Sequence, residues 1–209
     1  VVNRWLQLVG SIGYEDINDS TLGGNRSGMT WDAGVTLTPG PRTELTVRGG
    51  RRYREDNWSV RGVYRLSDRS IITLGYNEEV TSSARILQDQ LFVNRDQAAV
   101  DPGAFSLTNS SFLRKRAELG ISATRKRNVF GATVYHEKRT SGASYNRETS
   151  YGAGANFSRQ LSRAATAFIS GNYEHTKFDR GPARTDNFYM GQAGFTYKLS
   201  EYFSGGVTY

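Results

Sequence analysis

Arginine is the residue type whose spacing in this sequence points most directly to chemistry. Six arginines alternate with apolar residues and are predicted to share the inward face of a β-sheet: Arg48, Arg52, Arg61, Arg65, Arg114 and Arg116. Four glutamates are predicted on the same face: Glu44, Glu79, Glu118 and Glu174. Rings of arginine select anionic permeants, so these residues form a candidate anion path, which we call the basic ladder. The alternative is that the opposite charges pair across strands and fill the lumen, and we favour it because such pairs stabilise a sheet wherever they meet.

Other kinds of chemistry have little support in the sequence. There is no cysteine, which excludes disulfides and thiolate chemistry. The two histidines, His136 and His175, fall on different predicted strands, and neither has the nucleophile and orienting group that hydrolysis requires. The acidic segment 15–19 fits no calcium-loop spacing. We therefore expect no catalytic residue, no metal site and no cofactor.

The charge balance is positive and limits the partners. The 209 residues include 27 Lys+Arg and 20 Asp+Glu, for a formal net charge of +7. Such a charge suits nucleic acid, anionic lipid, lipopolysaccharide or an anionic solute. The basic run Arg125-Lys126-Arg127 lies in a predicted short turn and belongs to no recognised nucleic-acid motif, so we expect no nucleic-acid partner.

Alternation of apolar and polar residues over about ten positions predicts the elements that carry these side chains. Leu45 and Val47, for example, alternate with Glu44, Thr46 and Arg48. Eleven such segments follow one another, each long enough to cross a bilayer as a tilted strand. No run approaches eighteen consecutive apolar residues, which excludes a transmembrane helix.

The connections between these segments alternate in length. Short turns with related sequences occur at 39–42, 66–69, 161–163 and 199–201, and three of them begin with Leu-Ser. The other connections are mostly longer and polar, for example 18–27 and 139–147, and 81–111 is the longest. All four prolines are predicted to fall in connections, because proline cannot donate to a central strand ladder. Short turns on one side and long loops on the other are typical of outer-membrane barrels, so we expect 81–111 to be extracellular.

Aromatic residues lie mostly near the ends of the predicted strands. Rings with an apolar body and a polar tip favour the membrane interface. The predicted interface aromatics are Tyr14, Trp31, Tyr53, Trp58, Tyr64, Tyr76, Tyr151, Tyr173 and Tyr197.

The sequence therefore predicts an all-β fold in a single domain, 1–209: an antiparallel up-and-down transmembrane β-barrel of the bacterial outer membrane. A soluble β-sandwich is the alternative, but it seldom needs strands of ten or more residues in hairpin order. Bacterial single-chain barrels have even strand numbers. Eleven strands therefore indicate an incomplete barrel of twelve or more, with at least one strand following Tyr209.

Three segments carry a resemblance to a known family. They are 39–53 (PGPRTELTVRGGRRY), 58–67 (WSVRGVYRLS) and 74–82 (LGYNEEVTS), and together they resemble the outer-membrane barrel proteins associated with the PEP-CTERM/exosortase exopolysaccharide system. The resemblance covers residues 39–82. It implies an outer-membrane location and a gene neighbourhood shared with that system. It brings no enzymatic residue with it.

Two functional hypotheses follow. The first is a non-enzymatic, porin-like channel or scaffold that exports or anchors an anionic exopolysaccharide. The second is a structural barrel that sheaths or anchors a protein partner through its lumen or its long loop. Outer-membrane lipid and lipopolysaccharide are the expected surroundings in either case. An outer-membrane enzyme is disfavoured by the missing catalytic groups.

Overall fold

In the computed structural model, the described residues form β-strands with short connections at 41–42, 68–69, 126–127 and 161–164. It describes residues 5–19, 24–52, 55–82, 111–141, 146–179, 184–198 and 204–208. The strands are β1 (Leu6–Asp19), β2 (Gly24–Gly40), β3 (Thr43–Arg52), β4 (Glu55–Ser67), β5 (Ser70–Ser82), β6 (Ser111–Arg125), β7 (Asn128–Ser141), β8 (Asn146–Gln160), β9 (Ala165–Phe178), β10 (Arg184–Lys198) and β11 (Ser204–Thr208). Across these ranges, no helix is long and apolar enough to span a membrane.

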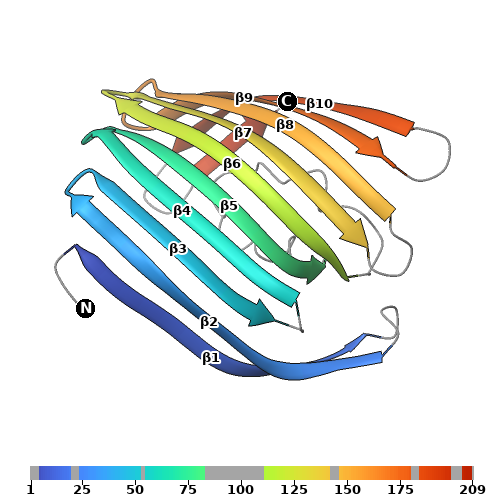
Figure 1. Ribbon diagram of the computed structural model, residues 1–209. Coiled ribbons are helices and arrows are strands. Elements are labelled where there is room, and N and C mark those ends of the chain that lie inside the picture. Colours follow the sequence, from blue (N-terminus) through green and yellow to red (C-terminus); the bar gives the residue numbers. More distant parts are fainter. Residues whose placement is uncertain are drawn as a thin grey trace.

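The strands form one sheet in which each pairs only with its neighbours in sequence. The order runs from β1 to β11, and every pairing is antiparallel. Figure 1 shows a curved sheet, with β1 at the lower edge of the view and β9 and β10 at the upper. The predicted all-β, antiparallel up-and-down fold is confirmed. Closure into twelve or more strands stays a prediction.

The outward face of the sheet is apolar and remains exposed. One register row joins Leu74 to Leu119 and Leu119 to Val134, and these side chains are 50%, 48% and 50% exposed. Among the described residues, the buried apolar side chains are Phe112 and Ala165. A water-soluble domain buries such a face and seldom leaves a large apolar patch in water. The sheet is therefore suited to a lipid environment.

The repeated Leu-Ser turns have a local cause. The Ser162 hydroxyl accepts hydrogen bonds from the backbone N–H groups of Ala164 and Ala165 at 3.1 and 3.0 Å. The Ser67 hydroxyl accepts one from the N–H of Arg69 at 3.2 Å. A serine that bonds the backbone two residues further on stabilises a turn without a glycine. The third copy, 199–201, lies outside the described residues.

Several predicted connections prove to be strand. Most of 139–147 belongs to β7 and β8, and β1 and β2 take up parts of 18–27. Pro39 lies inside β2, at the register irregularity between Leu37 and Gly40, so the prediction that every proline lies in a connection is wrong at this position. The apolar alternation ends before the hydrogen-bonded ladder does, because strand ends beyond an apolar band can carry polar residues on both faces.

The longest predicted loop lies mostly outside the description. Thr81 and Ser82 end β5, Ser111 begins β6, and 83–110 is outside the described residues. β5 and β6 pair directly, from Ser82 with Ser111 to Ser70 with Ala123.

Candidate functional site

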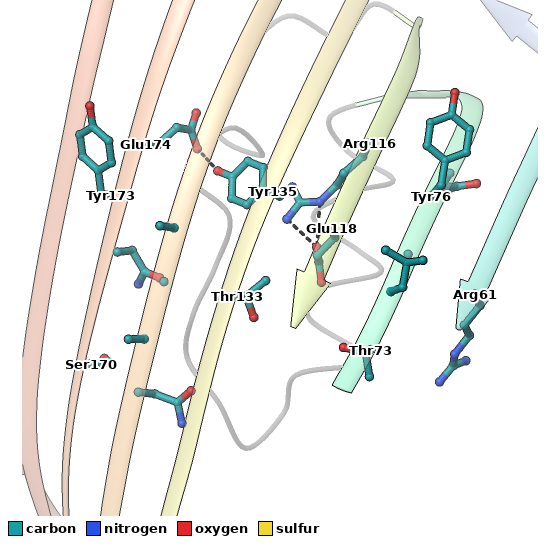
Figure 2. Close-up of a pocket in the computed structure, with 18 of the residues that line it drawn as sticks. Arg61, Thr73, Tyr76, Arg116, Glu118, Thr133, Tyr135, Ser170, Tyr173 and Glu174 are labelled. Carbon is teal, nitrogen blue, oxygen red and sulfur yellow. Dashed lines mark hydrogen bonds and ion pairs between the residues drawn. The ribbon is translucent and has the colours of Figure 1, made fainter. Parts of the chain in front are cut away.

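The inward, concave face of the sheet borders an open cavity of about 1410 Å³, lined by strands from β3 to β10 (Figure 2). Seven of the predicted lumen residues line it: Glu44, Arg48, Arg61, Arg114, Arg116, Glu118 and Glu174. Glu79 lies on the same face, directly opposite Arg114. Arg65 lies near the short turns, where its Nη1 donates to the Pro41 carbonyl at 3.3 Å. The Arg52 side chain lies outside the described part.

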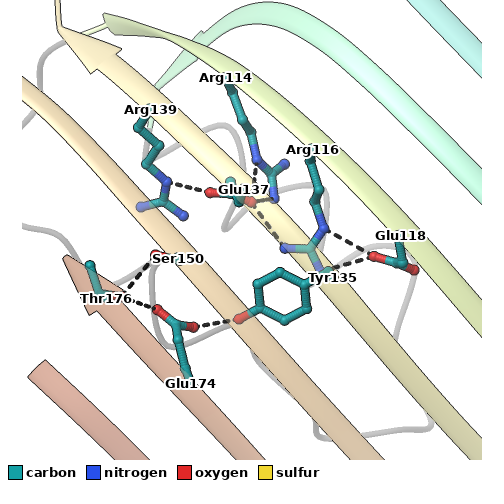
Figure 3. A network of polar contacts seen from close by, with 9 residues as sticks. All are labelled: Arg114, Arg116, Glu118, Tyr135, Glu137, Arg139, Ser150, Glu174 and Thr176. Carbon is teal, nitrogen blue, oxygen red and sulfur yellow. Dashed lines mark hydrogen bonds and ion pairs between the residues drawn. The ribbon is translucent and has the colours of Figure 1, made fainter.

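The centre of the site is a glutamate that sequence reasoning missed. Glu137 is 1% exposed, and three arginines surround its carboxylate (Figure 3). Arg114 donates to Oε2 through Nε at 2.9 Å and approaches it through Nη2 at 2.7 Å. Arg116 donates to the same oxygen through Nη1 at 3.0 Å, and Arg139 donates to Oε1 through Nε. Such charge-assisted bonds are the strong ones in proteins.

A second set of contacts extends this cluster toward β9. Arg116 donates through Nε to Glu118 at 3.0 Å, and its guanidinium lies 3.8 Å from the centre of the Tyr135 ring. The Tyr135 hydroxyl donates to Glu174 at 2.5 Å. Thr176 donates to the other Glu174 oxygen at 3.0 Å and shares a 2.8 Å hydrogen bond with Ser150. The contacts in Figure 3 therefore join four strands, β6 to β9, into one polar network.

The ring of Tyr135 fits this network because β8 has a glycine beneath it. Tyr135 and Gly152 are direct cross-strand partners, and a Cβ on Gly152 would lie 2.2 Å from two ring atoms of Tyr135. The ring has little freedom to move aside, since Glu174 holds its hydroxyl and Arg116 covers its face.

We expect Gly152→Ala to lower the free energy of unfolding by about 1–3 kcal/mol, the usual cost of overpacking. Urea titration of the folded protein in detergent measures it. Gly75→Ala is the control on the same concave face, because the nearest atom to its added Cβ is 3.9 Å away. Equal effects in the two variants would contradict the steric role of Gly152.

The other predicted arginines do not join this cluster. Arg48 pairs with Asp32, to which its Nε donates at 2.6 Å, and Ser11 donates to the same carboxylate. Arg61 is exposed, and within the described residues it has no hydrogen bond, ion pair or ring contact. The described part of the basic ladder is thus divided into one ion pair between β2 and β3, two exposed arginines on β4 (Arg61 and Arg65), and the network on β6 to β9.

Charges on the concave face are balanced. Counting only residues whose side chains the structure describes, strand register places eight basic side chains on this face: Arg48, Arg61, Arg65, Arg114, Arg116, Arg139, Arg184 and Lys198. Eight acidic ones share it: Asp32, Glu44, Glu79, Glu118, Glu137, Glu148, Glu174 and Asp186. The excess of positive charge in the described strands therefore lies on the outward face, not on the cavity wall.

The predicted interface aromatics lie on the outward face as far as they are described. Seven are exposed there by 38–71%: Tyr14, Trp31, Trp58, Tyr64, Tyr151, Tyr173 and Tyr197. Tyr76 shares their face through its register with Val60 and Ala117, and its hydroxyl donates to Glu78 at 3.1 Å. Tyr76 and Tyr173 also border the cavity. Tyr53 lies outside the described residues.

Chemically, the site offers charge and hydrogen bonding. In the described part of the chain, no group of three or more His, Cys, Asp or Glu side chains is placed to hold a metal ion. His136 packs against the Tyr151 ring at 4.7 Å, and His175 shares a 2.8 Å hydrogen bond with Asn187. Both lie on the outward face, away from the charged cluster.

Comparison with known proteins yields likeness of structure only. No family model matches the sequence, and no curated protein matches it. Solved structures similar to the chain include the copper transporter OprC, at 14% identity and a TM-score of 0.47, over 95% of this chain and 39% of OprC. OmpT, an outer membrane protein of Vibrio cholerae, follows at 7% identity and 0.44, over 98% of this chain and 84% of OmpT. The Pseudomonas putida toluene transporter TodX has 10% identity and 0.37, over 98% of this chain and 72% of TodX. This chain thus spans well under half the length of OprC.

Proposed function

We propose that the chain is a non-enzymatic β-barrel of the bacterial outer membrane whose concave wall lines a polar passage. The observation that carries the proposal is the combination of an exposed apolar outward face with a charged inward face. On β8 the outward residues between Thr149 and Arg159 are Tyr151, Ala153, Ala155 and Phe157. Ten residue steps at about 3.3 Å each, tilted by about 40°, span roughly 25 Å, which is the height of the apolar band on outer-membrane barrels.

The wall itself supports passage of polar solutes with little preference for either sign of charge. Among the residues whose side chains are described, its basic and acidic groups are equal in number, and the arginines of the network bind carboxylates. Selection of ions by a pore depends on rings of one sign of charge. A balanced wall is therefore expected to conduct small cations and anions at comparable rates.

An anionic exopolysaccharide is the more specific candidate for the solute. It is favoured by Arg61, which lines the cavity, is exposed and has no polar partner in the described residues, and by the resemblance of residues 39–82. A polymer carboxylate can bind such an arginine in a bidentate manner. The structural alternative, a barrel that holds a protein partner, requires no open passage.

Planar-bilayer recording of the full-length protein tests the passage. We expect discrete conductance steps with weak ion selectivity, and a shift toward cation selectivity in Arg61→Gln. Ser59→Gln, on the neighbouring position of the same face, is the control because it removes no charge. A bilayer that stays silent under voltage would contradict an open passage and favour the structural barrel.

A further inference from the structure

A row of lysines crosses the outward face of four strands just beyond the apolar band. Lys115 on β6 is directly opposite Lys138 on β7, Lys138 is opposite Thr149 on β8, and Thr149 is opposite Lys177 on β9. The next outward row toward the short turns contains Ala117, His136, Tyr151 and His175. The lysine row thus lies where the apolar surface gives way to polar side chains.

The positive charge of this row is not balanced by the described residues around it. Like charges that face each other directly across two strands destabilise a sheet. Glu78 binds Lys115, with 2.6 Å between its carboxylate oxygen and Nζ, and Glu78 also accepts a hydrogen bond from Tyr76. Lys138 and Lys177 are exposed and make no ion pair with a described residue.

Neighbouring residues extend this basic surface without changing its net charge. Arg147 is exposed and lies on the same face one register row further out, opposite Thr140. The Arg147 carbonyl accepts a hydrogen bond from the backbone N–H of Asp179 at 3.0 Å. Asp179 is an exposed acid directly after the end of β9. Among the described residues, four cations therefore share this corner of the outward face with two acids, Glu78 and Asp179.

We propose that this row, Lys115, Lys138 and Lys177 with Arg147, binds the phosphate groups of the phosphorylated glycolipid of the outer leaflet. The proposal rests on the proposed function, which places the outward face in the membrane.

The lysine row lies at the strand ends opposite the short turns, and in outer-membrane barrels the short turns are periplasmic. Its level is therefore that of the lipid headgroups of the outer leaflet. Lysine is a compact point charge that binds phosphate well, and a lipid phosphate at this height would separate the facing ammonium groups of Lys115 and Lys138.

The test compares binding of three defined probes to the full-length protein in detergent: diphosphorylated lipid A, chemically dephosphorylated lipid A and inorganic phosphate. Native mass spectrometry counts the bound lipid, and the heat-induced shift of the folded band on a gel reports stability. We expect diphosphorylated lipid A to bind and to raise the unfolding temperature, whereas dephosphorylated lipid A binds weakly. Lys138→Gln combined with Lys177→Gln should weaken binding roughly 25-fold, because each basic residue near an anionic membrane surface contributes about a fivefold effect.

The matched control is Arg125→Gln combined with Arg159→Gln. This variant removes the same charge from the outward face at the opposite end of β6 and β8, and it should bind lipid A as the unmodified protein does. Lys138→Arg combined with Lys177→Arg should restore binding. Equal binding of the two lipid forms would overturn the proposal, and so would equal loss of binding in the two glutamine double variants. A rise in unfolding temperature with inorganic phosphate as large as that with diphosphorylated lipid A would also overturn it. Failure of the unmodified protein to show a heat-shifted folded band would instead count against the membrane barrel.

Discussion

Glu137→Gln is expected to lower the free energy of unfolding by about 3–5 kcal/mol, the usual cost of breaking a buried ion pair from one side. Glu137 is 1% exposed, and its carboxylate is shared by Arg114, Arg116 and Arg139. Glutamine keeps the shape but not the charge, so three guanidinium groups would remain close together around a neutral amide. Urea titration of the protein folded in lipid vesicles, followed by tryptophan fluorescence, measures the change.

Glu118→Gln is the matched control. Its carboxylate also binds Arg116, at 2.9 Å, but its side chain is 41% exposed. Exposed pairs contribute about 0–1 kcal/mol because water screens both charges. A loss for Glu137→Gln that is no larger than the loss for Glu118→Gln would contradict the central role of the buried carboxylate.

Glu137→Gln also separates the two interpretations of the basic ladder, an anion path and a set of charges that pair with one another. With Glu137 neutral, the concave face of the described strands gains one net positive charge, and the arginines lose their shared acceptor. Bilayer recording of Glu137→Gln should therefore show a shift toward anion selectivity relative to the unmodified protein. An unchanged selectivity would indicate that these arginines do not face the conducting path.

The fold could be predicted from the sequence because its strongest signal is local. Alternation with period two assigns each residue of a strand to one face, and hairpin order determines which strands are neighbours. The face of Leu74, Leu119 and Val134 follows from that rule alone. Strand ends do not follow from alternation in the same way. The sequence pattern predicts a loop at Arg139, yet Arg139 lies in β7, because polar residues on both faces remove the alternation while the backbone pairing continues.

The site could be predicted only in its composition. Sequence periodicity placed Arg114, Arg116 and Glu118 on one inward face, and the structure brings these three together. It did not identify Glu137, since which acid binds which arginine depends on cross-strand register. That register depends on turn geometry, and Gly152 then leaves room for the Tyr135 ring opposite it. One sequence feature does indicate Glu137: it lies two residues from both Tyr135 and Arg139, so the three share one face of a strand.

Val134→Arg provides the largest test of the membrane location, because it places a charge in the middle of the outward apolar face. Val134 is 50% exposed and has Leu119 and Ala153 as its cross-strand partners. An arginine facing lipid near the bilayer midplane costs about 2–4 kcal/mol. The expected result is a loss of that size in the unfolding free energy of the protein in vesicles.

The neighbouring residue on the same strand supplies the control. Thr133→Arg adds the same side chain on the concave face, where Thr133 borders the cavity, and should change the free energy of unfolding by less than about 1 kcal/mol. If the outward face were in water, arginine at an exposed position would be tolerated there as well, and Val134→Arg would cost no more than Thr133→Arg. A difference of several kcal/mol between neighbouring residues of one strand therefore requires two different solvents on the two faces of the sheet.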